Sequence, residues 1–196
     1  MDIEELKNLI KQGKFKNPTT GELFLGDIVR ELINYRNKDL MSKYRIFIGT
    51  DSEEREKGID FVSVIAIHRI GKGGRYFWLR SYDKQKLEFR NRIFKEVTIS
   101  LALAYALLEQ ELENNNIPVA AGKSVIEAIK ELEQNPVNNF KSLILDKEFE
   151  IHVDIGNNGP TSAMIKEIVG MIKGSGFFVK IKPEAFAAAN VADKHL

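Results

Sequence analysis

Hydrophobic residues near the start of the chain recur at helical spacing. Ile3, Leu6 and Ile10 share one helical face, with acidic residues before them and a lysine after them, as the helix dipole favours. A second amphipathic segment begins behind Asp27, which we place as its N-cap. Residues 1–42 are therefore predicted to form a helical N-terminal extension.

From Tyr44 onward the pattern changes to that of β-strands. β-branched and aromatic residues dominate five segments, and the turn GKGG joins the second segment to the third as a hairpin. The five predicted strands are YRIFIGTD (44–51), FVSVIAIHRI (61–70), RYFWLRSY (75–82), EFEIHVDIG (148–156) and FFVKIK (177–182).

Helical patterns lie between and after the last strands. Residues 88–113 carry apolar side chains at helical spacing, a further helix ends at the GSG of residues 174–176, and the alanine-rich residues 183–196 are predicted to be helical. Residues 114–146 show no clear pattern beyond a short helix, and we interpret them as an insertion. Because helical crossovers favour parallel pairing, the chain predicts one α/β domain over residues 1–196 with a mixed five-stranded sheet.

Composition narrows the class of protein. The chain has no apolar run of the roughly 18 residues that a membrane span needs, and its N-terminus is acidic and amphipathic, so we expect a cytoplasmic protein that does not enter a membrane. The lack of cysteine fits a reducing compartment. Any metal would therefore be held by oxygen or imidazole ligands.

Positive charge is concentrated in one segment. The formal net charge is only +1, so no overall field attracts nucleic acid. Residues 84–95 are nevertheless basic, and Lys86, Arg90 and Arg92 lie there, shortly before Glu96. We interpret these three side chains as a candidate surface for the phosphates of nucleic acid.

Four acidic residues are candidates for a shared site. Asp51 and Asp154 each end a predicted strand, and ligands of α/β sheets bind at the carboxyl ends of strands. Either aspartate could instead cap its own following turn. Glu96 flanks the apolar stripe of its helix, where it could also be an exposed partner of Arg92, and Asp193 could belong to a polar tail. Because burial of an unpaired carboxylate is costly, each aspartate needs a cation, a cap or a turn role, so a metal site and a pair of local caps both stay open.

Two histidines stand close to these acids in the sequence. His152 precedes Asp154 by two residues and in a strand would share its face, as a ligand or as a hydrogen-bond partner beside the site. His195 follows Asp193 by two residues and in a helix would point away from it, although a frayed end would let it reach the site as a proton carrier. We rank both histidines below the carboxylates.

Three segments, IGTDS, HVDIGNNGPT and IVGMIKGSGFFVKIKPEAFAAANVADKH, resemble the YkuK-type RNase H-like family, as does the order of the elements. The resemblance implies an RNase H-like fold with a four-carboxylate site. The four carboxylates would be those of Asp51, Glu96, Asp154 and Asp193. The resemblance further implies Mg²⁺ or Mn²⁺ as cofactor and a nuclease acting on DNA or RNA, in which two cations about 3.5 to 4 Å apart clamp the attacking and leaving oxygens of a phosphodiester.

Two other classes of function stay open. Actin-like phosphotransferases share the same core, and the segment DIGNNGPT loosely resembles their phosphate loop, with Thr161 facing a phosphate. A noncatalytic module for nucleic-acid binding or assembly would keep the fold without the chemistry. Metal-dependent cleavage would indicate the nuclease, and nucleotide binding without cleavage would indicate the phosphotransferase. Neither result would indicate the noncatalytic module.

Overall fold

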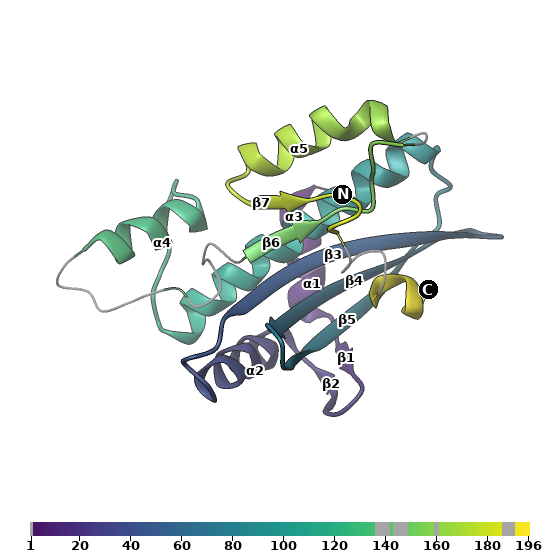
Figure 1. Ribbon diagram of the computed structural model, residues 1–196. Helices are drawn as coiled ribbons and strands as arrows, with labels where there is room; N and C mark the ends of the chain where they lie inside the picture. The colour runs from purple at the N-terminus through teal and green to yellow at the C-terminus, as the bar shows by residue number, and fades with distance from the viewer. Residues whose placement is uncertain (1, 136–141, 143–148, 159–160, 186–190) are drawn as a thin grey trace.

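A seven-stranded mixed sheet forms the centre of the protein (Figure 1). The computed structural model describes residues 2–135, 142, 149–158, 161–185 and 191–196. Within them the strand order is β2-β1-β5-β4-β3-β6-β7. The five predicted strands correspond to β3 (Tyr44–Arg55), β4 (Gly58–Arg69), β5 (Gly73–Asp83), β6 (Phe149–His152) and β7 (Phe178–Lys180). The first three pair antiparallel, whereas β6 and β7 pair parallel to β3 and to each other, as the crossovers predicted.

The prediction of five strands is wrong by two. A hairpin of β1 (Phe15–Asn17) and β2 (Gly21–Leu23) extends the sheet at the free edge of β5, where Lys16 pairs with Trp78. Residues 1–42, predicted to be helical, therefore also carry two strands. Each of these strands has three residues, too few to show a period of two in the sequence.

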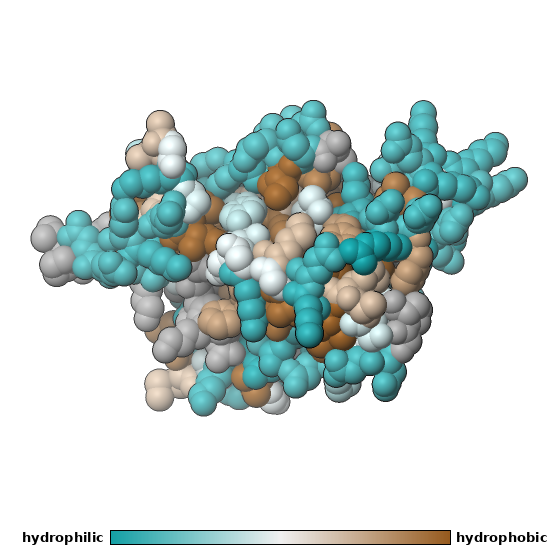
Figure 2. Space-filling model, turned by 90° about the horizontal axis from the view of Figure 1, so that it is seen from above, coloured by the Kyte–Doolittle hydropathy of each residue, from teal (hydrophilic) through white to brown (hydrophobic). Residues whose placement is uncertain are grey.

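The first predicted strand is also longer than its apolar run. β3 continues through Asp51 to Arg55 and stays paired with β4 over its whole length, so Asp51 does not end a strand. This end of the β3–β4 hairpin projects from the body of the sheet (Figure 1), and Figure 2 shows that it is hydrophilic. Water on both faces removes the alternation by which a half-buried strand is recognised.

Five α-helices lie in the described residues, and their buried apolar side chains all belong to one hydrophobic core. They are α1 (Ile3–Gln12), α2 (Leu25–Asn37), α3 (Phe89–Asn114), α4 (Val125–Gln134) and α5 (Ile165–Gly174), with a 3₁₀ turn, η1 (Ser162–Met164), before α5. All five agree with the predicted helical patterns, and α4 lies in the predicted insertion. Residues 136–141 and 143–148 of that insertion lie outside the described residues.

The start of α2 differs in detail from its prediction. Phe24 occupies the N-cap position, and Asp27 lies three residues later, inside the first turn. A carboxylate oxygen of Asp27 accepts the backbone N–H of Phe24 at 3.2 Å. The aspartate thus still satisfies a free donor at the helix start, but from the N3 position of a capping box.

The two faces of the sheet have separate hydrophobic cores. Ile46 and Ile48 of β3 belong to the larger core, which includes the apolar stripe of α3. Phe47, between them, belongs to a smaller cluster with Ala192 on the opposite face. The C-terminal segment covers that face in front of the strands (Figure 1) and ends in a 3₁₀ turn, η3 (Asp193–His195).

The predicted C-terminal helix is described only in part. Of residues 183–196, residues 186–190 lie outside the described part, and the last regular element is η3, a single turn. Among the helices that the structure describes, none combines the length and the apolar character needed to cross a membrane.

Candidate functional site

Three of the four predicted carboxylates, Asp51, Glu96 and Asp154, line one pocket of about 310 Å³. The sheet register explains the first pairing. The parallel ladder of β3 and β6 ends where Gly49 faces His152, so Asp51 and Asp154 each lie two residues farther along. The other residues that line this pocket are Phe89, Arg92, Ile93, Gly156, Asn158, Thr161 and Lys182. We call it the carboxylate pocket.

Asp51 is half-buried on β3. Its Oδ1 accepts the backbone N–H of Ser52 at 2.8 Å, which is the local contact that a turn or strand aspartate often makes. Burial nevertheless raises the pKa of Asp51 to about 6, and the negative charges of Asp154 and Asp193 add to the rise. The N–H of Ser52 and the charge of Arg92 oppose it. A local hydrogen bond therefore does not compensate this carboxylate fully.

Glu96 comes from α3 and is 4% exposed. The exposed helix glutamate considered from the sequence is therefore wrong. The hydroxyl of Ser52 donates to Oε1 of Glu96 at 2.5 Å, which joins the helix to β3 beside Asp51. Burial raises the pKa of Glu96 to about 8, and the charges of Asp51 and Asp154 raise it further, against the opposing effects of Ser52 and Arg92. Without a bound cation Glu96 is thus mostly protonated at neutral pH.

Asp154 follows β6 by two residues and pairs with a lysine that sequence reasoning missed. The ammonium of Lys182 lies 2.8 Å from Oδ1 of Asp154, in an ion pair that lacks hydrogen-bond geometry, so this buried oxygen accepts no hydrogen bond. Lys182 stands two residues beyond β7, the strand beside β6. Its place in the KIKPEAFAA segment, just after a parallel strand, was the available signal.

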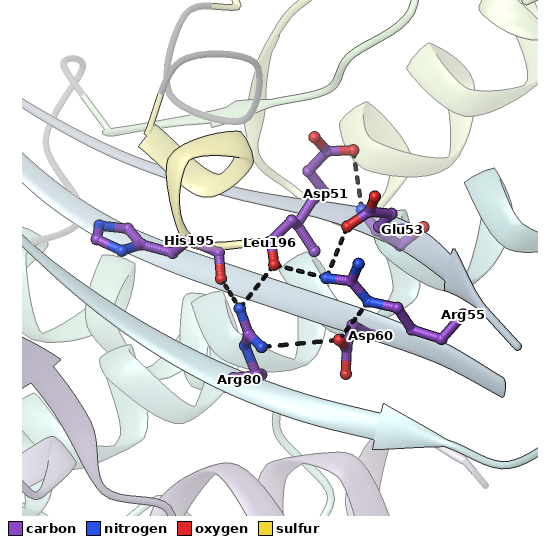
Figure 3. Close-up of polar contacts among 8 residues, drawn as sticks. Asp51, Glu53, Arg55, Asp60, Arg80, His195 and Leu196 are labelled. Atoms are coloured by element: carbon purple, nitrogen blue, oxygen red, sulfur yellow. Dashed lines mark hydrogen bonds and ion pairs between the residues drawn. The ribbon is translucent and has the colours of Figure 1, made fainter. Parts of the chain in front are cut away.

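Asp193 lies beside this pocket and does not line it. It is exposed on η3, yet its charge contributes to the raised pKa of Asp51, so the two carboxylates are near each other. Two arginines hold η3 against the sheet, and Figure 3 shows their contacts next to Asp51. Arg55 donates to the carbonyl of Leu196 at 2.6 Å, and Arg80 donates to the carbonyls of both His195 and Leu196.

The oxygen ligands of the pocket suit a hard divalent cation in their chemistry. Within the described ranges, however, no three acidic or histidine side chains stand close enough together to hold one ion. Glu96 is engaged by Ser52, and Asp154 is engaged by Lys182. The set therefore fits a cation in ligand type and charge, and binding requires side-chain movement.

Of the three predicted basic residues, only Arg92 lines the pocket. Its guanidinium lies 5.6 Å from the ring centre of Phe89, and its Nε is buried without a hydrogen-bond partner. Lys86 pairs with Glu54 at 3.3 Å, and Arg90 pairs with Glu167 at 2.5 Å. The structure therefore separates the predicted basic surface into one residue at the pocket and two that form ion pairs elsewhere.

The two histidines pack against aromatic residues of the smaller hydrophobic cluster, outside the pocket. His152 is 1% exposed, stacks on Phe47 and shares a hydrogen bond with Glu150 at 3.1 Å, and burial lowers its pKa. His195 stacks on Trp78 with ring centres 3.9 Å apart, and its pKa is lowered by burial and by nearby positive charges. Figure 3 shows the His195 ring directed away from Asp51. Neither histidine lines the carboxylate pocket.

Fold and sequence comparison agree on the class of protein. Residues 27–196 match the Ribonuclease H-like family, and this match covers most of the chain, so the protein belongs to that family, in its YkuK-type branch. It is 28% identical over 182 residues to "Uncharacterized protein YkuK" of Bacillus subtilis (strain 168), an alignment that covers 92% of this chain and 95% of that protein. No solved structure matches the chain. The family predicted from the sequence is confirmed.

Proposed function

We propose that the protein is a divalent-metal-dependent nuclease that hydrolyses phosphodiester bonds in the carboxylate pocket. The observation that carries this proposal is that one pocket combines two carboxyl groups of raised pKa with a buried cationic donor. Asp51 and Glu96 have raised pKa values there, and Arg92 has a buried Nε without a partner. A bound cation would reduce the free-energy cost of burying the carboxylate charges. A phosphate oxygen would accept a hydrogen bond from the buried Nε of Arg92.

The proposed metal ligands are Asp51, Glu96, Asp154 and Asp193, which would hold Mg²⁺ or Mn²⁺. When bound, such ions polarise a phosphoryl oxygen and lower the pKa of water. The chain supplies the placement: β3 and the end of β6 hold the two aspartates side by side, α3 brings Glu96 from the helical face of the sheet, and η3 brings Asp193 beside Asp51. Ser52 fixes Glu96 through its hydroxyl.

Nucleic acid would enter along the side of the pocket that carries Arg92 and Phe89. Arg92 can offer its guanidinium to a phosphate without reading base sequence. Phe89 is 43% exposed at the start of α3 and can stack on a base of any identity. These two contacts favour nucleic acid over a small phosphate ester as substrate.

Cleavage assays on a panel of labelled nucleic acids test this proposal. The panel contains single-stranded DNA, single-stranded RNA, both duplexes and the hybrid, each with Mg²⁺, Mn²⁺ or chelator. We expect cleavage of at least one substrate with metal and none in chelator. If no substrate is cut with either metal while the protein is folded, the nuclease proposal is wrong.

The same panel separates the alternatives. Thr161 accepts the backbone N–H of Gly156 at 3.3 Å, so this hydroxyl closes the loop after β6 where a phosphate-binding role was considered. Binding of ATP without cleavage of nucleic acid would favour a phosphotransferase. Binding of nucleic acid without cleavage would favour the noncatalytic module.

Replacing Arg92 with glutamine is expected to weaken nucleic-acid binding and to lower the salt dependence by about one unit of slope in log K against log[salt]. Arg90→Gln and Lys86→Gln are the matched controls and should change affinity less, because ion pairs with Glu167 and Glu54 hold those side chains. Fluorescence anisotropy at several salt concentrations measures the slopes. Equal losses in all three variants would contradict a special role for Arg92.

A further inference from the structure

A lysine already occupies one carboxylate of the pocket. Lys182 Nζ lies 2.8 Å from Oδ1 of Asp154, and the two side chains are 53% and 23% exposed. An ion pair with one partner so exposed contributes only a modest stabilisation in water. The long, flexible stem of a lysine also lets the ammonium move while its backbone stays in place.

The backbone of this lysine is fixed beside Asp154. Val153 donates its N–H to the carbonyl of Lys180 at 2.9 Å, and Lys182 donates its N–H to the carbonyl of Ile155 at 2.8 Å, so the β6–β7 pairing brackets the ion pair. Gly156 lies against the base of the same side chain, where an added Cβ would come within 3.3 Å of the Lys182 Cβ. The ammonium can therefore change partner, but it stays at the rim of the pocket.

We propose that Lys182 is an exchangeable counter-ion, which neutralises Asp154 in the metal-free protein and moves to a phosphate of bound nucleic acid when a divalent cation takes its place. This inference rests on the proposed function. An ammonium and a divalent cation repel each other, so a cation bound to Asp154 weakens the hold of this carboxylate on Lys182. Arg92 lines the same pocket and would contact phosphate as well, so the displaced lysine would bind the same chain of phosphates.

Metal titration gives the first test. Lys182→Met removes the charge and keeps an unbranched stem, and it is expected to bind Mn²⁺ about 2- to 5-fold more tightly than the parent by calorimetry, the range that a half-exposed ion pair contributes. Lys182→Arg should not bind Mn²⁺ more tightly than the parent. Lys173→Met is the matched control, because this exposed lysine of the last turn of α5 changes the net charge equally. Equal Mn²⁺ affinities in the parent and Lys182→Met would overturn the proposal.

Nucleic-acid binding gives the second test, with an oligonucleotide checked for intactness after each reading. In chelator, Lys182→Met should bind about as well as the parent, since the lysine is held by Asp154. With Mn²⁺, the variant should bind about 3- to 10-fold more weakly, with a salt slope lower by about one. An equal loss in chelator and in Mn²⁺ would show that Lys182 contacts phosphate without exchange, and would overturn the proposal.

The two tests distinguish this inference from the proposed function. If the parent binds Mn²⁺ and cuts nucleic acid while Lys182→Met has unchanged Mn²⁺ affinity, the exchange is wrong and the nuclease proposal stands. If the parent binds no Mn²⁺ and cuts nothing, both proposals are wrong. Thermal melts in chelator check the variants, and Lys182→Met should melt slightly below the parent because Asp154 has lost its partner.

Discussion

Asp51→Asn is expected to reduce metal-dependent cleavage by at least about 100-fold, since even the residues that support metal ligands contribute 10- to 100-fold. Asparagine keeps an oxygen that can accept the N–H of Ser52, so the local hydrogen bond survives while the charge is lost. The variant should also bind Mn²⁺ more weakly. Gel assays of cleavage and calorimetric titration of Mn²⁺ measure the two effects.

Glu53→Gln is the control for this variant. Glu53 is an exposed carboxylate two residues from Asp51 on the same strand, and it pairs with Arg55 instead of lining the pocket. Its neutralisation changes the total charge by the same amount and should leave cleavage within about 2-fold of the parent, as expected for an exposed side chain that does not line the pocket. If Asp51→Asn still cuts nucleic acid at the parental rate, Asp51 is a structural residue and the site is misassigned.

The parts of the fold that were predictable from sequence are those with buried apolar side chains. The apolar stripe of α3 follows from helical periodicity because it packs against the main core, whereas β4 follows from its nearly continuous apolar run because it is buried on both faces of the sheet. The hairpin of β1 and β2 and the far end of β3 were not predicted, because short or fully solvated strands show no alternation of apolar and polar residues. Asp27 was placed in the right turn and at the wrong position, because an acid in the first turn serves a helix start from N-cap or from N3.

The candidate site was predictable in its acids and less so in its cations. Asp51 and Asp154 could be paired because parallel neighbours align their strand positions, and the register places them at the same level. Lys182 and the actual partners of Lys86 and Arg90 depend on contacts between segments far apart in the chain, which local spacing does not contain. The packing of His152 on Phe47 likewise depends on a contact between segments far apart in the chain.

The stability of the metal-free protein is expected to fall as the pH rises, and Glu96 is the main cause. Its pKa is about 8 in the folded protein against an ordinary value of 4.5. Between these values the folded state holds a proton that the unfolded state has released, so the free energy of unfolding decreases with pH. Asp51 acts in the same direction between 3.8 and about 6. The stabilisation from both groups is complete at low pH and is lost for Glu96 as the pH passes about 8.

Glu96→Gln isolates this effect. Glutamine has no charge to bury, so in chelator at pH 9 the variant should be more stable than the parent by on the order of a few kcal/mol, and the difference should vanish below about pH 4, where Glu96 of the parent is protonated in both the folded and the unfolded state. Urea melts across this range measure the difference, with Glu113→Gln, an exposed acid of the same helix, as control. Saturating Mg²⁺ should stabilise the parent at pH 8 and reverse the order, because only the parent offers the cation this carboxylate. If Glu96→Gln and the parent lose stability in parallel from pH 5 to 9, the pH dependence does not come from ionisation of Glu96. The raised pKa would then no longer support Glu96 as a metal ligand.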